Sequence, residues 1–442
     1  MAQRDQPLAA LVIYYNSGSL PLRLTVAQHI RFLEQSGHRH RVVYWNCGIA
    51  PPRWLRSLDF DVIVLHYSAL AVRWQPQFAR RRSGLDWIAT SPAAKIAMPQ
   101  DEYDRAAVLD EWLEDLRVDA VMSVLHPRAW PTIYPRTGRL VRIERTLTGF
   151  INDADVRPFE SLIPHARRDF DIVYRARALP FRYGSVAQMK YRIADVVGQR
   201  ADALRLITDI STDLDATKYG TSWMAFLESG RAVIGSESGV SVLDRDWTIR
   251  DTEDRLLRAN PSLTFEEFSA AMPTGWDDHR FTAISPRSFE AATAGCAQLL
   301  IEGEYSGVLE PGAHYVPIAQ DLSNLDDVLT MTRDPRATEK LARHAHAELV
   351  LSGRYTYRRL ADDVERLVAE VGPRPRHIRV NRPGRLAAPV ARVQSFVGAE
   401  LVTRTYWFIH RRTPVLVPPI RAAVRLGRAM RTRVGSGSNP TS

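Results

Sequence analysis

Ile284-Ser-Pro-Arg-Ser-Phe-Glu-Ala-Ala-Thr-Ala-Gly-Cys-Ala-Gln-Leu-Leu-Ile-Glu-Gly303 is a short stretch with the signals of a loop, a helix, a tight turn and a strand. Ser285 can cap a helix by accepting from its first amides, and Pro286 suits the first helical position because it has no amide to lose. Gly295 can end the helix in a left-handed conformation, after about three turns. The apolar run within 298–302 is typical of a buried parallel strand. The stretch therefore predicts one unit of an α/β domain.

The start of this helix has the chemistry of a phosphate site. The first turn of a helix presents unpaired amides and a partial positive charge, and Arg287 and Ser288 lie beside them. Glu290, one turn further, can lie on the same rim and accept hydrogen bonds from the vicinal hydroxyls of a ribose. The alternative is an ordinary capped helix whose arginine and glutamate are merely solvated.

The C-terminal half contains three motifs in a fixed order: Arg-Ser-Phe-Glu-Ala-Ala at 287–292, Leu-Glu-Pro-Gly at 309–312 and Tyr-Thr-Tyr-Arg-Arg at 355–359. Together they resemble the C-terminal half of glycosyltransferases of the GT-B fold, most of all the branch of spore-maturation glycosyltransferase-like proteins. The resemblance covers 284–370.

The resemblance implies roles for individual residues. The helix start would hold the diphosphate of a nucleotide-sugar through Arg287 and Ser288, and Glu290 would bind the ribose. Many retaining members carry a second glutamate eight positions before the ribose glutamate, where this chain has Thr282. The stereochemistry of the reaction is therefore left open.

The bulk composition is that of a soluble protein of two or three domains. The chain has 442 residues, of which 45% are hydrophobic and 25% are charged. Cys47 and Cys296 lie far apart, which supports neither a disulfide framework nor a thiolate metal site and indicates a reducing compartment. We find neither a signal peptide nor an apolar run of about 18 residues. The sequence predicts a cytoplasmic protein.

The net charge of +9 is unevenly distributed. Residues 373–442 carry 14 arginines and one acid, a charge of +13, which leaves −4 for 1–372. Apolar clusters alternate with arginines over 390–433, a pattern that suits an interfacial helix on an anionic membrane surface at the inner face of the membrane. The alternative is that the tail packs back on the enzyme body. No nucleic-acid recognition module accompanies it, so no nucleic-acid partner is predicted.

Strand-like runs alternate with helical segments in two successive regions, which implies parallel sheets with right-handed crossovers. We predict an N-terminal Rossmann-like, acceptor-side domain over 1–163, a C-terminal Rossmann-like, nucleotide-sugar-binding domain over 164–372, and an Arg-rich amphipathic tail over 373–442 with a disordered end. Within the second domain, a strand is predicted over 202–209. The resemblance implies that the two domains face each other across a cleft, as in the GT-B fold.

Polar residues at the carboxyl ends of parallel strands face the ligand crevice of open α/β sheets. In the N-terminal domain these residues are His66, Asp101, Glu102 and His126. An inverting enzyme needs a general base from this domain, and Asp101, Glu102 or His126 can supply it. In the alternative interpretation, Asp101 or Glu102 caps the following helix and His126 simply ends a strand.

Two loops of the second domain add candidates for donor binding. The family places phosphate contacts after the first strand of this domain, which implicates Arg175 and Arg177, although a basic surface loop would look the same. The loop after the predicted strand 231–235 is small and polar enough to approach a nucleotide closely. Its candidate residues are Gly235, Ser236 and Glu237.

The expected function is transfer of a sugar from a nucleotide-diphosphate-sugar to a glycan or lipid-linked acceptor, in cell-surface polysaccharide or glycoconjugate synthesis. Arg175, Arg287 and the helix amides would neutralise the leaving diphosphate, so no metal or other cofactor is expected. One alternative is a catalytically inactive GT-B-fold protein that binds glycan or glycolipid. Another is a metal-dependent glycosyltransferase that uses the Asp-x-Asp pair Asp244 and Asp246.

Overall fold

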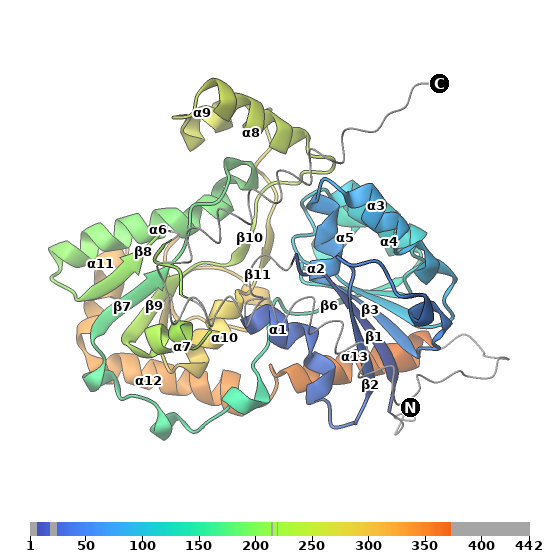
Figure 1. Cartoon of the computed structure of the whole chain (residues 1–442). Coiled ribbons are helices and arrows are strands. Elements are labelled where there is room, and N and C mark those ends of the chain that lie inside the picture. The colour runs from blue at the N-terminus through green and yellow to red at the C-terminus, as the bar shows by residue number, and fades with distance from the viewer. Residues whose placement is uncertain (1–6, 18–23, 214, 219, 373–442) are drawn as a thin grey trace, which may run out of the picture.

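The computed structural model describes residues 7–17, 24–213, 215–218 and 220–372. The predicted tail 373–442, including its membrane-binding stretch 390–433, lies outside these residues. The described chain forms two parallel sheets with helices on both faces, and a small two-stranded antiparallel sheet lies between them (Figure 1). The predicted α/β class is therefore confirmed, and the two sheets with their helices fit two Rossmann-like domains.

The first sheet has six parallel strands in the order β2-β1-β3-β4-β5-β6. Successive side chains of a strand point to opposite faces, so Leu11 and Ile13 pack in one buried cluster and Ala10 and Val12 in another. The strands are β1 (Ala9–Tyr14), β2 (Arg41–Asn46), β3 (Val62–His66), β4 (Ala94–Met98), β5 (Ala120–Ser123) and β6 (Arg142–Arg145). The helices of this region are α1 (Leu24–Ile30), α2 (Tyr67–Leu70), α3 (Phe78–Ser83), α4 (Ala106–Asp115) and α5 (Trp130–Ile133).

The second sheet has five parallel strands in the order β13-β12-β9-β7-β8. One face carries α6 and α11, and the other carries α7 and α10. The strands are β7 (Phe170–Arg175), β8 (Thr208–Ser211), β9 (Gly230–Gly235), β12 (Ala297–Ile301) and β13 (Val316–Ile318). The helices are α6 (Gly184–Ala203), α7 (Thr221–Glu228), α10 (Pro286–Thr293), α11 (Leu325–Thr330) and α12 (Pro335–His346).

The predicted strand over 202–209 is wrong over 202–207. Helix α6 continues to Ala203, and β8 begins at Thr208. The helix reaches into this range because its buried residues follow helical spacing as far as Ala201, with Val197 and Ala194 on the same face.

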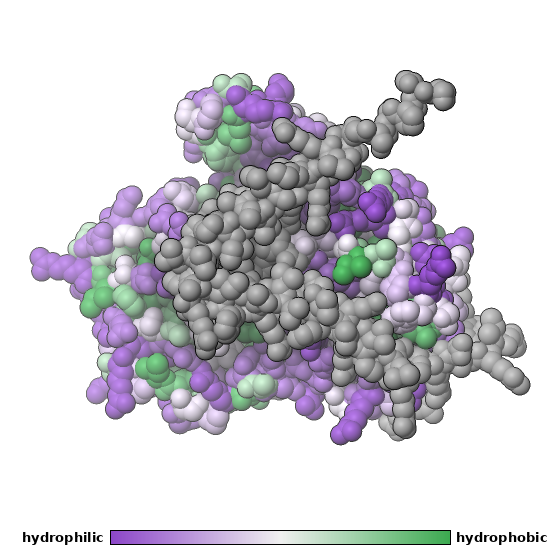
Figure 2. Space-filling model, in the orientation of Figure 1, coloured by the Kyte–Doolittle hydropathy of each residue, from purple (hydrophilic) through white to green (hydrophobic). Residues whose placement is uncertain are grey.

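An insertion between β9 and α10 joins the two halves. It consists of β10 (Ser238–Val240), α8 (Thr248–Ala259), α9 (Phe265–Ala270) and β11 (Phe281–Ala283), and its helices project from the body (Figure 1). Val240 and Phe281 are buried in the core cluster of the first sheet, and Asp104 pairs with Asp244 as a short parallel bridge. Figure 2 shows small separate groups of hydrophobic residues among hydrophilic ones on the described surface of this face.

The last described helix, α13 (Tyr357–Val371), packs against the first sheet although it follows the second in sequence. Its apolar stripe, which includes Leu360, Val364 and Leu367, is buried against Ala10 and Val12. The stripe needs an apolar partner, and the uncovered face of the first sheet provides it. The boundaries 1–163 and 164–372 stay a prediction, but the spatial unit around the first sheet includes this helix.

The sequence predicts neither a disulfide framework nor a membrane-spanning helix. Cys47 and Cys296 are buried and free of disulfides. Among the helices that the structure describes, none is both long enough and apolar enough to cross a bilayer.

A buried histidine pair lies beside β3. His66 Nε2 is 3.1 Å from His29 Nδ1, and His66 Nδ1 is 2.8 Å from the hydroxyl of Ser68. Burial lowers the pKa of His29 from 6.5 to about 4 and holds the pKa of His66 well below its ordinary value. In mild acid these histidines therefore stay neutral in the folded protein but are protonated in the unfolded chain.

This pair predicts a loss of stability in mild acid. Above pH 6.5 the histidines are neutral in both states and do not reduce the free energy of unfolding. As the pH falls from 6.5 toward 4, the free energy of unfolding decreases, because in that range only the unfolded state binds protons at His29. His29 alone should lower the free energy of unfolding by about 2 kcal/mol at pH 5. Urea unfolding at pH 7.5 and pH 5 measures the difference, and His29→Gln should reduce it. An unchanged difference in the variant would assign the effect to other groups.

Candidate functional site

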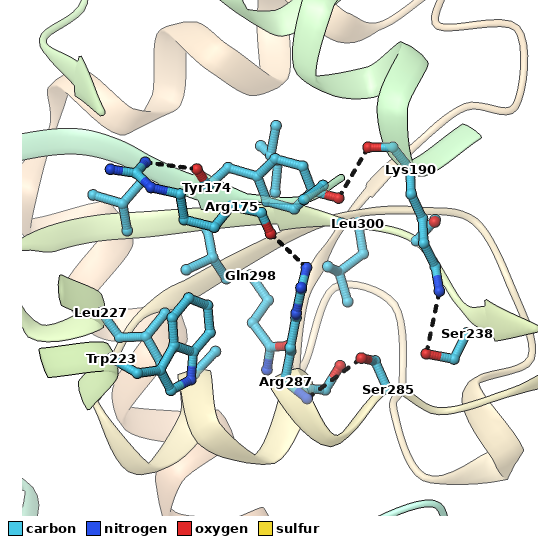
Figure 3. A pocket seen from close by; sticks show the side chains of 18 of the residues that line it. Tyr174, Arg175, Lys190, Trp223, Leu227, Ser238, Ser285, Arg287, Gln298 and Leu300 are labelled. Carbon is cyan, nitrogen blue, oxygen red and sulfur yellow. Dashed lines mark hydrogen bonds between the residues drawn. The ribbon is translucent and has the colours of Figure 1, made fainter. Parts of the chain in front are cut away.

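A pocket of about 200 Å³ opens at the topological switch point of the second sheet, where β7 and β9 lead their loops to opposite sides. Its walls come from the loops after β7 and β9, from α6 and α7, and from the start of α10 (Figure 3). The polar and aromatic lining residues are Arg175, Arg177, Lys190, Trp223, Phe226, Ser236, Ser238, Ser285, Arg287, Ser288 and Gln298.

The start of α10 has the predicted local structure. Ser285 caps the helix by accepting from the amide of Arg287 at 3.4 Å, and Gly295 ends the turn with a φ of 65°. The tip also lies against the first half of the chain, because the Thr148 hydroxyl donates to the carbonyl oxygen of Ile284. The helix N-terminus thus borders the pocket next to residues of the N-terminal domain.

Arg287 and Glu290 are both connected to Trp223. The Arg287 guanidinium donates to the carbonyl oxygen of Arg175 at 2.6 Å and lies 5.7 Å from the centre of the Trp223 ring. The indole N–H of Trp223 donates to Glu290 Oε2 at 2.8 Å. Ser288 is buried and lines the pocket. The first turn of α10 and the tryptophan of α7 therefore form one side of the site.

Arg175 is placed differently from the expectation that it would bind phosphate. It is buried, and its guanidinium donates to the Asp209 carboxylate at 2.6 Å and to the carbonyl oxygens of Asp209, Ala216 and Tyr174. These bonds hold the pocket wall together and leave little donor capacity for a ligand. Arg177 is exposed at the rim.

Lys190 is a site residue that the sequence analysis missed. It extends from α6 into the pocket, and its Nζ lies 3.5 Å from the Ser238 hydroxyl (Figure 3). Burial, together with the charge of Arg287, lowers the pKa of Lys190 to about 8, while Asp101 acts in the opposite direction. Lys190 is three residues from Ala187 and three from Ile193, which are both buried. This helical spacing in the sequence could have predicted that Lys190 lies on the inner face of the helix.

Gln298 was also missed. It is only 1% exposed, and within the described part of the chain neither its amide nitrogen nor its amide oxygen has a hydrogen-bond partner. Figure 3 shows it between Trp223 and Arg287. The sequence feature that could have indicated it is a glutamine within an otherwise apolar strand.

Of the three candidate residues in the loop after β9, two line the pocket and one does not. Gly235 and Ser236 line the pocket, as expected for residues that approach a ligand. Glu237 is buried, where its carboxylate accepts from the amide of Tyr305 at 2.9 Å and bonds to Thr282, and burial raises its pKa. Glu237 thus supports the loop after β12, and it is not among the pocket-lining residues.

Asp101 is the exposed carboxylate among the predicted bases. It follows β4 with a left-handed φ of 50° and accepts from the Tyr103 hydroxyl at 2.6 Å. The fully buried Arg73 donates to the carbonyl oxygens of Asp101 and Asp104, which holds this turn. The charge of Asp101 acts on Lys190 and raises its pKa, and strained backbone of this kind is often found at functional sites.

The other candidates of the N-terminal domain are engaged elsewhere. Glu102 is fully buried, accepts from Ser123, Val124 and Tyr134, and has a pKa that burial raises to about 7. Its carboxylate therefore organises the interior of this domain and is closed to a ligand. His126 is half-buried and accepts from the amide of Arg128 at 3.1 Å. His66 belongs to the buried histidine pair.

Two groups were considered as metal ligands. Asp244 accepts through Oδ2 from the amide of Arg250, and Asp246 accepts through Oδ1 from the amide of Thr248, both at 3.1 Å. Asp244 Oδ1 is buried and has no hydrogen-bond partner within the described residues, but neither aspartate lines the pocket. This arrangement does not favour the metal-dependent alternative.

The second group is His314, His344 and Glu348, whose ligand atoms lie within 4.8 Å of one another. His314 Nδ1 accepts from the amide of Glu310 at 3.0 Å, so the neutral ring carries its proton on Nε2, the atom that faces Glu348. That proton blocks metal binding, and the group is better explained as a hydrogen-bonded pair of histidines around one carboxylate.

Comparisons with known proteins found only distant similarity. The sequence matches no family model and no curated protein. The chain is similar to solved structures of TarM (9% identity, 70% of this chain and 54% of TarM covered, TM-score 0.42), of AviGT4, a glycosyltransferase involved in avilamycin A biosynthesis (14%, 83% and 98%, 0.43), and of BGT of T4 phage in complex with its UDP-glucose substrate (11%, 81% and 99%, 0.46). It thus spans about half the length of TarM. The resemblance to the spore-maturation branch stays a prediction.

Proposed function

We propose that this protein is a glycosyltransferase that holds a nucleoside-diphosphate sugar in the pocket of the second sheet. The observation that carries the proposal is the meeting of two cations, Arg287 and Lys190, at the amide-rich start of α10. Cations and helix amides together bind a diphosphate well. The carboxylate of Asp101 follows β4 of the first sheet, and its charge acts on Lys190.

In the proposed reaction an acceptor hydroxyl attacks the anomeric carbon of the sugar. Asp101 takes the proton from this hydroxyl, and the bond from the sugar to the diphosphate breaks. Negative charge grows on the leaving diphosphate, where Arg287, protonated Lys190 and the first amides of α10 stabilise it. With Thr282 at the position of the second glutamate, we propose one displacement with inversion. The acceptor that we propose is a glycan or a lipid-linked glycan, as in the synthesis of cell-surface polysaccharide or glycoconjugates.

A panel of UDP-, GDP- and dTDP-sugars tests the proposal with the full chain. At least one donor should release its nucleoside diphosphate, at a rate that a chelator leaves unchanged. Binding without release would instead support an inactive glycan-binding protein. A rate lost with chelator and restored by Mn²⁺ would support the metal-dependent alternative. If none of the nucleotides binds, the proposed function is wrong.

Lys190 predicts a pH dependence of donor binding. Its pKa is about 8, so the lysine loses its positive charge as the pH rises above 8. The dissociation constant of the cognate nucleoside diphosphate should therefore rise about tenfold from pH 7 to pH 9. Titration calorimetry of the protein and of Lys190→Met measures the effect. The variant should bind weakly at both pH values, and a slope as steep as that of the unaltered protein would assign the titration to another group.

A further inference from the structure

The two ends of the pocket differ in chemistry. The mouth carries Arg287, exposed, and Lys190, half-buried. The inner end is lined by buried apolar side chains, namely Val173, Leu227, Val233 and Ala291. Arg175 also borders the pocket, but its guanidinium is committed to Asp209 and to three backbone carbonyls. An anionic group is therefore favoured at the mouth and an uncharged, flat group at the inner end.

Gln298 is the exception within this apolar lining. A buried amide without partners costs free energy, because it gives up its bonds to water and receives none in return. Both amide atoms of Gln298 are in this condition within the described residues, and the side chain borders the pocket. A ligand that enters the inner end can satisfy them both.

The amide selects the kind of group that fits. It presents one donor and one acceptor side by side, and so does the hydrogen-bonding edge of a nucleobase. A sugar ring would bring several hydroxyls next to the apolar side chains of Val173, Leu227, Val233 and Ala291, where they would lose their bonds to water without replacement. Trp223 and Phe226, whose ring centres are 5.7 Å apart, add aromatic surface next to the same space.

We propose that Gln298 binds the edge of the nucleobase of the donor, with the base at the inner end of the pocket and the diphosphate at Arg287 and Lys190. This proposal rests on the proposed function and adds which part of the donor goes where. It makes Gln298 the residue that reads the base. The unpaired amide is then a cost to folding that donor binding removes.

The test compares the unaltered full chain with Gln298→Leu, which keeps a side chain of similar size and removes both polar atoms. Calorimetry measures binding of UDP, dTDP, CDP, GDP and ADP, and of inorganic pyrophosphate, which has the charged end alone. We expect the unaltered protein to prefer some bases, and the variant to lose about tenfold or more in affinity for them, with pyrophosphate unchanged. The melting temperature of the unliganded variant should stay equal or rise, because an unpaired amide has been removed.

The outcomes separate this inference from the proposed function. Equal affinity of the variant and the unaltered protein for every nucleotide would overturn the role of Gln298 and leave the diphosphate site intact. A parallel loss of pyrophosphate binding would show that the substitution damages the pocket in general, which also contradicts base reading. If the unaltered protein binds neither nucleotides nor pyrophosphate, the proposed function itself fails.

Discussion

Asp101→Asn is expected to slow glycosyl transfer by about 100- to 10 000-fold, the contribution that a general base usually makes. The change removes the basic oxygen while keeping the shape of the side chain. Asparagine tolerates the left-handed backbone at this position, where φ is 50°, and its oxygen can still accept from the Tyr103 hydroxyl. We therefore expect an intact fold and an affinity for nucleoside diphosphate within about twofold of the unaltered protein. Single-turnover rates and calorimetry measure the two quantities separately.

Two variants serve as controls for this experiment. His126→Gln should retain most of the activity, because its ring already accepts from the backbone of Arg128. Glu102→Gln should instead lower the melting temperature, since the buried carboxylate accepts from three donors. Full activity of Asp101→Asn together with a collapse of activity in His126→Gln would move the base to His126.

Arg287→Ala is expected to weaken binding of the nucleoside diphosphate by about 1.5 to 3 kcal/mol, the size of a charge-assisted hydrogen bond. Its guanidinium is held at the start of α10 by the carbonyl oxygen of Arg175, so it is positioned before the ligand arrives. The loss should be the same for every base, because the guanidinium contacts the phosphate end of the donor in the placement that we propose. Calorimetry with the same panel of nucleotides provides the measurement.

Arg177→Ala is the matched control for Arg287. Arg177 also borders the pocket, but it is exposed, so solvent screens its interaction with a phosphate. Its replacement should therefore weaken binding by less than about 1 kcal/mol. Equal affinities of Arg287→Ala and the unaltered protein would remove the diphosphate from the start of α10. A larger loss in Arg177→Ala than in Arg287→Ala would place the phosphates on the loop after β7.

Local signals predicted the central unit well. Ser285, Pro286 and Gly295 act on the backbone within a few residues of themselves, so helix α10 and its left-handed end could be read from the chain. The alternation of strands and helices predicted two parallel sheets for the same reason. The strand over 202–209 failed because helix α6 continues where apolar residues allow either structure.

Long-range contacts decided the roles of several charged and polar residues. Arg175 had the position of a phosphate ligand in the sequence, but Asp209 on the neighbouring strand binds its guanidinium. Glu102 was as good a candidate base as Asp101 in the sequence, but in the structure Ser123, Val124 and Tyr134 donate to its buried carboxylate. The spacing of residues along the chain does not predict such partners, because they lie about 20 to 35 residues away in sequence.

The order of amino acids alone was enough to specify the α/β class and the capped helix that borders the pocket, because capping, periodicity and left-handed glycines are local effects. The composition of the pocket required the tertiary structure. Lys190, Gln298 and Arg287 come from three different elements and meet only because α6, β12 and α10 pack around one switch point. The return of α13 to the first sheet is likewise a matter of packing, since an apolar stripe specifies that it must be buried but not against which surface.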